Sequence, residues 1–189
     1  MMKIFRVIAI GLMLAAPVQA QDFDAGDYIE AVSSFRMAAE QGHVTAQVGL
    51  GFMYFDGLYV LQDYIEAAHW YRMAAEQGDT TAQSLLGEMY EYGQGVPQDY
   101  AEAAHWYRMA AEQGHAGGQI NLGVLYDRGE GVEQDNVSAH MWYNISAANG
   151  NATGAKLRDF VAKELTPDQI AEAQRRARAC MASNYQDCD

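Results

Sequence analysis

Basic residues are scarce in this chain of 189 residues. Twelve Lys and Arg stand against 25 Asp and Glu, which gives a formal net charge of −13. Nucleic acid is excluded as a partner, because binding it requires a basic surface. A cationic partner would be steered toward such a chain, although the acidity can equally serve to keep the protein in solution.

Cysteine is nearly absent as well, and the two that occur, Cys180 and Cys188, both lie at the C-terminal end. A site made of two thiolates lacks the four ligands that zinc prefers, so no metal site is expected. An even number of cysteines favours a disulfide wherever the compartment is oxidising. We therefore predict a bond between Cys180 and Cys188.

Long apolar runs are missing outside the first twenty residues. There Lys3 and Arg6 precede an apolar run from Val7 to Ala16, and a small-residue cleavage site follows at Val18-Gln19-Ala20. This order is typical of an export signal. The rival interpretation is a membrane-spanning helix, but the run is shorter than the roughly 20 residues that a bilayer requires. We expect a cleaved signal peptide, no membrane span after its removal, and a periplasmic or secreted protein.

An internal repeat of 36 residues dominates the rest of the chain. The segment from Tyr64 to Gly78 returns as Tyr100 to Gly114 with one difference, Ile65 against Ala101. Looser copies start at Tyr28 and Asn136. Self-similarity at a fixed period in this range indicates a stacked array of helical units.

Each unit carries start and stop signals for a first helix, helix A. An acidic N-cap is followed three residues later by Glu in three units, which predicts capping boxes, and a glycine in register ends each helix. The N-caps are Asp27, Asp63, Asp99 and Asp135, the glutamates Glu30, Glu66 and Glu102, and the glycines Gly42, Gly78, Gly114 and Gly150.

A second helix, helix B, follows almost at once, from Thr80 to about Tyr92 in the second unit. Gly51, Gly87 and Gly123 recur in its middle. A glycine inside a helix costs about 1 kcal/mol relative to alanine. Its recurrence predicts that another backbone packs closely at this point.

The fourth unit departs from the pattern, because Asp159 replaces the glycine of helix B. A final helix is predicted to start at Thr166, with Pro167 in its first turn and Gln169 as capping-box partner. Its apolar positions would cover the open end of the array, as terminal helices of repeat proteins do. These positions are Ile170, Ala173, Ala177 and Met181.

The predicted division of the chain follows from these signals. It comprises a signal peptide (1–20), a lead-in (21–26), three repeats (27–63, 64–99 and 100–135), a degenerate fourth repeat (136–164), and a capping helix with its tail (165–189).

The recurring pattern Ala-x-x-Trp-Tyr-x-x-Ala-Ala-x-x-Gly, followed by Ala-Gln-x-x-Leu-Gly, resembles the SEL-one-like repeat family, a relative of the tetratricopeptide repeat. The resemblance covers roughly residues 27–158. It implies an all-α fold, a right-handed α/α superhelical solenoid of four 36-residue helical hairpins with a C-terminal capping helix, which acts mainly as a binding scaffold. Some exported cysteine-rich members are associated with penicillin-like ligands and β-lactam hydrolysis. Those carry a cysteine pair in nearly every repeat, and this chain has one pair after the repeats.

If helix A lines the inner curve, as the resemblance implies, its polar positions form a groove. The candidate groove residues are Arg36, His69, Arg72, Glu76, His105, Arg108 and Glu112. The three arginines suit carboxylates or backbone carbonyls of an extended ligand. Alternatively they pair with Glu40, Glu76 and Glu112 four residues on, on a solvated face.

A shared metal between His69 and His105 is not expected. Neighbouring helices lie about 8–10 Å apart, whereas two imidazoles on one zinc each need a nitrogen about 2 Å from the ion. No serine-hydrolase motif, phosphate loop or paired-carboxylate signature occurs, and no cofactor is expected. We therefore predict a non-enzymatic scaffold for a protein, peptide or envelope glycan, with a β-lactamase-like cell-envelope hydrolase as the alternative.

Overall fold

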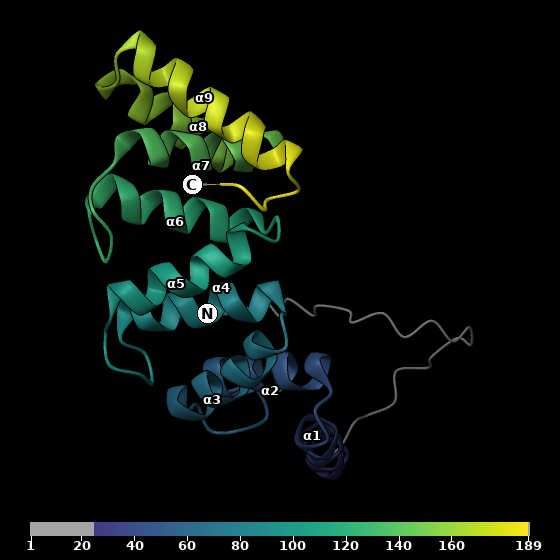
Figure 1. Ribbon diagram of the computed structural model, residues 1–189. Coiled ribbons are helices and arrows are strands. Elements are labelled where there is room, and N and C mark those ends of the chain that lie inside the picture. Colours follow the sequence, from purple (N-terminus) through teal and green to yellow (C-terminus); the bar gives the residue numbers. More distant parts are fainter. Residues whose placement is uncertain (1–24, 189) are drawn as a thin grey trace, which may run out of the picture.

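The computed structural model describes residues 25–188, and within this range the chain is entirely helical (Figure 1). The predicted all-α fold class is confirmed. The α-helices are α1 (Ala25–Glu40), α2 (Val44–Asp56), α3 (Tyr64–Glu76), α4 (Thr80–Tyr92), α5 (Tyr100–Ala111), α6 (Ala116–Arg128), α7 (Asn136–Ala148), α8 (Ala152–Val161) and α9 (Pro167–Ala182), with a short 3-10 turn at Ala162–Glu164.

The helices form consecutive hairpins, α1 with α2, α3 with α4, α5 with α6, and α7 with α8. Figure 1 shows these hairpins following one another in single file from α1 to α7, each in contact with the next. The odd-numbered helices α1 to α7 are the predicted A helices and the even-numbered helices are the B helices. The last helix, α9, packs on α7.

Three of the four predicted acidic N-caps are present. The Oδ1 atom of Asp63 accepts hydrogen bonds from the amides of Ile65 (2.9 Å) and Glu66 (3.2 Å). Asp99 caps α5 in the same way, and Asp135 caps α7 by accepting from the amide of Val137. The fourth prediction is wrong, because α1 begins at Ala25 and therefore includes Asp27.

The predicted capping boxes at these helices are also wrong in one respect. The amide of Asp63, which a reciprocal Glu66 bond would use, donates instead to the carbonyl of Tyr54 at 2.9 Å, so the preceding B helix has already satisfied it. Helix α9, which has no such neighbour, does form the complete box between Thr166 and Gln169.

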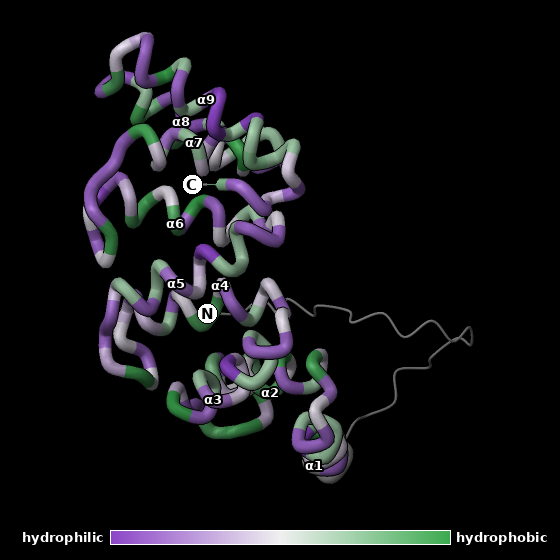
Figure 2. The backbone as a smooth tube through the Cα atoms, in the orientation of Figure 1, coloured by the Kyte–Doolittle hydropathy of each residue, from purple (hydrophilic) through white to green (hydrophobic). Residues whose placement is uncertain are grey.

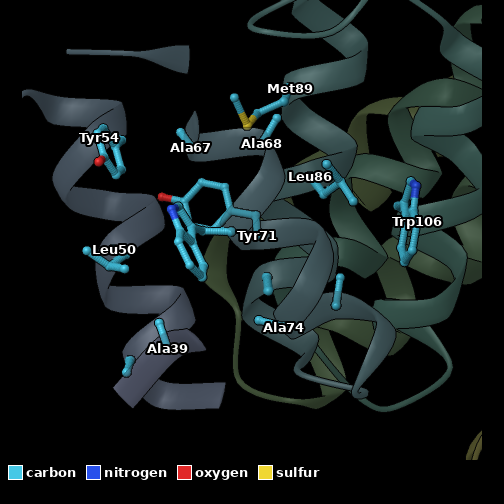
Figure 3. Packing of buried hydrophobic residues seen from close by; sticks show 14 residues of the cluster. Ala39, Leu50, Tyr54, Ala67, Ala68, Tyr71, Ala74, Leu86, Met89 and Trp106 are labelled. Carbon is cyan, nitrogen blue, oxygen red and sulfur yellow. The ribbon is translucent and has the colours of Figure 1, made fainter. Parts of the chain in front are cut away.

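The glycines inside the B helices receive tyrosine rings from the next hairpin. A Cβ atom at Gly51 would lie 2.3 Å from the ring of Tyr71, and one at Gly87 would lie 2.7 Å from that of Tyr107. Figure 3 shows Tyr71 in this buried layer, together with Leu50 and Leu86. The predicted close approach is confirmed, but the partner is an aromatic side chain rather than a backbone.

A ladder of buried amides crosses the A–B turns. Gln47 and Gln83 are fully buried, and each Nε2 donates to a helix-A carbonyl, of Ala39 and Ala75 respectively, at 3.1 Å. Each Oε1 accepts a hydrogen bond from the glutamine at the end of the next A helix. Gln77 donates to Gln47 at 2.7 Å, and Gln113 donates to Gln83 at 2.9 Å. These bonds join each hairpin to its neighbour.

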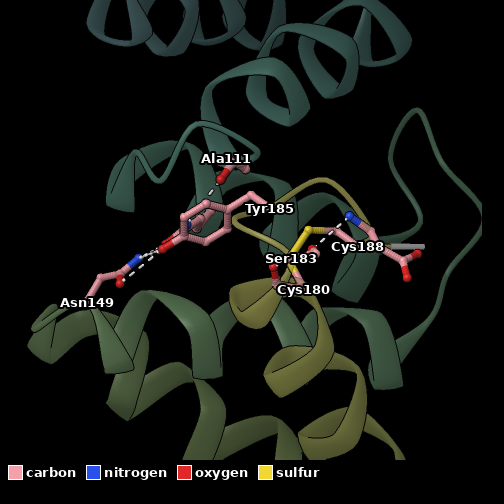
Figure 4. The surroundings of a disulfide bond; sticks show 8 residues. Ala111, Asn149, Cys180, Ser183, Tyr185 and Cys188 are labelled. Atoms are coloured by element: carbon pink, nitrogen blue, oxygen red, sulfur yellow. Dashed lines mark hydrogen bonds between the residues drawn. A yellow bond between two sulfur atoms is a disulfide. The ribbon is translucent and has the colours of Figure 1, made fainter.

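The C-terminal tail extends this ladder. A disulfide joins Cys180 to Cys188, as predicted, and the tail that it closes places Tyr185 beside Asn149 (Figure 4). The Nδ2 atom of Asn149 donates to the hydroxyl of Tyr185 at 3.0 Å and to Oε1 of Gln119 at 3.2 Å. The tail therefore adds Tyr185 to the last amide of the ladder, at the C-terminal end of α7.

The loop between α2 and α3 differs from the later interhelical loops. Tyr59 adopts a left-handed φ of 62°, where the equivalent Gly95 has 69° and packs its Cα against the carbonyl of Tyr64. The loop is hydrophobic (green in Figure 2), and Leu61 is 91% exposed. The first repeat thus leaves an apolar edge at its end of the array.

Candidate functional site

The exposed side of the A helices carries the predicted groove residues. We define the helix-A face by a set of exposed or partly buried residues on α1, α3 and α5. They are Ser33, Arg36, Met37 and Glu40 on α1, Ile65, His69, Arg72, Met73 and Glu76 on α3, and Ala101, His105, Arg108, Met109 and Glu112 on α5. Their periodicity places them opposite buried residues such as Ala67 and Tyr71.

The three arginines of the helix-A face bind tyrosines across their own hairpins. An Nη2 atom of Arg72 donates to the hydroxyl of Tyr90 at 2.5 Å, and Arg108 does the same to Tyr126 at 2.6 Å. Arg36 makes the equivalent bond to Tyr54.

Sequence reasoning did not foresee these arginine–tyrosine bonds, although arginine and tyrosine recur together 18 residues apart. Among residues 25–188, the expected ion pairs of Arg36 with Glu40 and of Arg72 with Glu76 are not formed. A guanidinium has five N–H donors, so one bond to tyrosine positions the group and leaves further donors for a ligand.

The histidines of the helix-A face are exposed and lie against tryptophan. The rings of His69 and Trp70 meet edge-on with centroids 5.1 Å apart, and those of His105 and Trp106 at 5.3 Å. Both indoles are buried. The face therefore presents imidazoles that are backed by the hydrophobic core.

On α7 the same side of the helix is covered. Ser138, Met141 and Ile145 occupy the positions of Glu66, His69 and Met73, yet they are only 3%, 1% and 0% exposed. Helix α9 provides the cover, since Ala173, Ala177 and Cys180 belong to the same buried cluster as Met141 and Ile145.

Sequence reasoning identified α9 as a terminal cover but missed that it lies on this face. The signal that could have revealed it was the replacement of His69 and His105 by Met141, together with that of Glu66 and Glu102 by Ser138.

An ion pair also joins α9 to the start of α7. Arg176 lies 3.9 Å from the Oδ2 atom of Asp135, the N-cap of α7. Partial burial acts against ionisation of Asp135, but hydrogen bonds from Ser138 and Val137 and the charge of Arg176 together lower its pKa. A basic position on the covering helix thus pairs with the acidic start of an A helix.

The remaining histidines lie apart from the helix-A face. His115 caps α6 by accepting from the amide of Gly118 at 3.0 Å, and burial lowers its pKa. His140 is buried in α7, where burial and then the charge of Arg158 lower its pKa. Within the described part of the chain, no three His, Cys, Asp or Glu side chains come together to hold a metal ion.

Two further observations bear on the cellular context. Between residues 25 and 188, no helix combines the length and hydropathy needed to cross a bilayer. The disulfide of Cys180 and Cys188 is of the kind that persists in oxidising compartments. The predicted signal peptide lies outside the described residues.

Solved structures with similar chains share this architecture. A protective antigen, c5321, from uropathogenic Escherichia coli, described as displaying an SLR fold, is 45% identical with a TM-score of 0.66; the match covers 68% of this chain and 27% of that protein. This chain thus spans about a quarter of that relative.

Two shorter structures match over nearly their whole length. A Sel1 repeat protein from Oxalobacter formigenes is 38% identical with a TM-score of 0.63, over 69% of this chain and 98% of that one. Cysteine rich protein B of Helicobacter pylori, at 19% identity and a TM-score of 0.57 over 72% and 98%, shares the fold. A search of the curated proteins found no match.

The sequence profile of the Sel1 repeat matches four consecutive segments, 25–43, 44–79, 80–115 and 116–151. Each full segment combines a B helix with the A helix that follows it. Sel1 repeats usually form scaffolds that mediate protein interactions. With four matched repeats and the solenoid fold, this chain belongs to the Sel1 repeat family.

Proposed function

We propose that this protein is an exported scaffold that binds a peptide or protein segment on the helix-A face of α3 and α5. The proposal rests on the packing of α9, a segment of the same chain, against the side of α7 that corresponds to the helix-A face of α3 and α5. On α3 and α5, His69 and His105 remain exposed at the position where α9 buries Met141. The repeat geometry therefore supports a seat for a segment there.

The chemistry of the face favours a ligand with both polar and apolar groups. Met73 and Met109 are half-buried and offer an adaptable apolar strip. Arg36, Arg72 and Arg108, positioned by their tyrosines, retain donors for carboxylates or backbone carbonyls of the ligand. Glu76 and Glu112 are the face's acidic counterparts. An envelope glycan would engage the same donors and acceptors.

The proposal is tested with peptides selected from a displayed random library against the chain from residue 21 onward. We expect selected peptides to lose affinity in the double variant His69→Ala and His105→Ala. His43→Ala, an exposed histidine in the α1–α2 turn, is the matched control and should bind normally. Equal binding by all three proteins would contradict the proposal.

A second comparison tests the arginines. The variant with Arg36, Arg72 and Arg108 changed to Ala should bind more weakly, provided that it unfolds at a similar temperature. Its control changes Lys156, Arg175 and Arg178, which are exposed basic residues outside the face, to Ala and so removes the same charge. Similar losses in both variants would assign the effect to net charge alone.

Export is tested by the mass of the protein recovered from the producing cell. We expect a chain that begins at Gln21, outside the cytoplasm. Retention of residues 1–20 would contradict it. Turnover of the β-lactam nitrocefin, abolished by substitutions on the helix-A face, would replace the scaffold proposal with the hydrolase alternative.

A further inference from the structure

A polar cleft lies on the side of the B helices, where the second and third repeats meet. Its volume is about 250 Å³. Because a water molecule takes up about 30 Å³ in the liquid, the cleft has room for several waters or for an extended side chain. It is lined by Glu88, Glu91 and Tyr92 of α4, Tyr107 of α5, and Asn121, Val124 and Arg128 of α6.

The inner part of the cleft holds a carboxylate without a cationic partner. Glu91 is 8% exposed, and its Oε2 accepts a hydrogen bond from the hydroxyl of Tyr107 at 2.8 Å. Among the described residues no Lys, Arg or His forms an ion pair with it. Burying an ionised carboxylate is unfavourable unless an opposite charge compensates it.

A second carboxylate shares the cleft. Glu88 is half-buried one helical turn before Glu91, and burial, followed by the charge of Glu91, raises its pKa. Arg128 also lines the cleft, but its ion pair, at 3.6 Å, is with Glu130 rather than with Glu88 or Glu91. Two acidic groups therefore face one cavity, and neither forms an ion pair within the described residues.

The equivalent positions at the other junctions are different. The first junction has Phe52 and Phe55 in place of Glu88 and Glu91, and the third has Val124 and Asp127. The hydroxyls of the equivalent tyrosines, which are buried there, have no hydrogen-bond partner. The pair of glutamates is thus a feature of one junction and not a requirement of the repeat.

We propose that this cleft binds a primary ammonium group, carried by a lysine side chain or by the N-terminus of a partner. An ammonium has three N–H donors and no acceptor. The lone pairs of Glu91 that Tyr107 and Tyr92 leave unused, the carboxylate of Glu88 and the amide oxygen of Asn121 supply matching acceptors. The rings of Tyr92 and Tyr107 add aromatic walls, which attract a cation lying over the ring face. This site is separate from the helix-A face and does not depend on its function.

The test uses small probes and the mature chain labelled with ¹⁵N. Nα-acetyl-lysine N-methylamide presents a side-chain ammonium, glycinamide an α-ammonium, and the Nε-acetylated lysine probe the same shape without charge. We expect at least one ammonium probe to shift amide resonances of residues 88–92 and 121–128. The acetylated probe should leave them unchanged. The two ammonium probes together distinguish a lysine side chain from an N-terminus.

A charge-matched pair of variants identifies the carboxylates. Glu88→Gln with Glu91→Gln should weaken ammonium binding about tenfold or more, because charge-assisted hydrogen bonds are lost. Glu66→Gln with Glu102→Gln removes the same charge from α3 and α5 and should bind as the wild type does. Glu88→Gln alone, which leaves the Tyr107 bond untouched, gives the same answer if the double variant fails to fold.

Three results would overturn the proposal. They are unchanged cleft resonances at saturating concentrations of both ammonium probes, equal shifts with the acetylated probe, and equal loss of binding in the two charge-matched variants. The last result would assign binding to the net negative charge of the chain.

Discussion

Helix α7 and the pair α3 and α5 occupy equivalent places in their repeats but meet different surroundings. On α7, Met141 and Ile145 are covered by α9, whereas on α3 the equivalent His69 is exposed. The ends of α3 and α7 are alike. Each helix begins at an aspartate N-cap, Asp63 or Asp135, and each is followed by a side-chain amide of the ladder, Gln77 or Asn149. The covered helix therefore differs from the open one in the side chains at three positions, those of Ser138, Met141 and Ile145.

This contrast shows how a repeat can either extend an array or close it. A B helix with glycine in its middle accepts the tyrosine of a further hairpin, as Gly87 accepts Tyr107. In α8 the residue at that position is Asp159, which is exposed and bonded to Arg158. Among residues 25–188 no further hairpin packs on α8, and the chain instead returns over α7.

A charge placed in the interface between α9 and α7 should have the largest effect on stability. Ala177 is fully buried in the interface with α7, so Ala177→Glu buries an unpaired carboxylate and should lower the free energy of unfolding by about 3 kcal/mol or more. Chemical denaturation measures this. Ala179→Glu, at an exposed position of the same helix, is the control. Equal effects would mean that α9 is not held by this interface.

Removal of the disulfide should have the next largest effect. Changing Cys180 and Cys188 to Ala opens a short loop and should cost about 2–3 kcal/mol. Hydrogen exchange should rise first in the tail around Tyr185, because the disulfide and the hydrogen bond with Asn149 hold this segment in place. Unchanged exchange in the tail would show that the Asn149 contact is sufficient.

Substitutions at the glycine position of the B helices should affect stability differently in α4, which another hairpin covers, and in α8, which ends the array. Gly87→Ala forces the ring of Tyr107 to move, and overpacking of this kind costs about 1–3 kcal/mol, more than the helix propensity gained. Asp159→Ala should change stability by less than about 0.5 kcal/mol, as exposed substitutions do. Thermal or urea unfolding compares the two. A neutral Gly87→Ala would contradict the close packing.

The smallest expected effect concerns pH. Because the pKa of His140 is lowered in the folded state, the unfolded chain binds more protons, and stability is lost as the pH falls below about 6.5. His140→Ala supplies the residue of α3 and α5, Ala68 and Ala104, and should reduce this loss by about 1 kcal/mol or less at pH 5.5.

Unfolding at pH 7.5 and pH 5.5 measures the difference between wild type and His140→Ala. His115, whose pKa is also lowered, remains in both proteins and contributes equally. An identical acid dependence in both would show that His140 titrates as it does in the unfolded chain.

Much of the architecture could be predicted from the sequence, because the repeat determines local structure many times over. The helix ends at Gly78 and Gly114, the caps at Asp63 and Asp99, and the terminal helix with its box at Thr166 all follow from local chemistry. Predictions from local sequence failed where a neighbouring hairpin supplies a hydrogen-bond partner. The amide of Asp63, for example, donates to the carbonyl of Tyr54 instead of to Glu66.

The site could be predicted less well, for the same reason. The hydrogen bonds from Arg72 to Tyr90 and from Tyr107 to Glu91 join separate helices, so the pattern of a single helix does not contain them. Pattern reasoning offered Arg72 a bound ligand or Glu76 on its own helix, and it did not consider Tyr90 on the adjacent B helix. Comparison of equivalent positions across repeats, which would have shown Glu88 and Glu91 replacing Phe52 and Phe55, was the unused signal.

The most direct test of the helix-A face is the chemical reactivity of its histidines toward diethylpyrocarbonate, with and without a selected peptide. His43 is exposed in the same molecule but lies outside the face, so it serves as an internal reference. We predict that the peptide slows modification of His69 and His105 several-fold and leaves His43 unchanged. Full reactivity of His69 and His105 while the peptide is bound would place the ligand elsewhere and contradict the account.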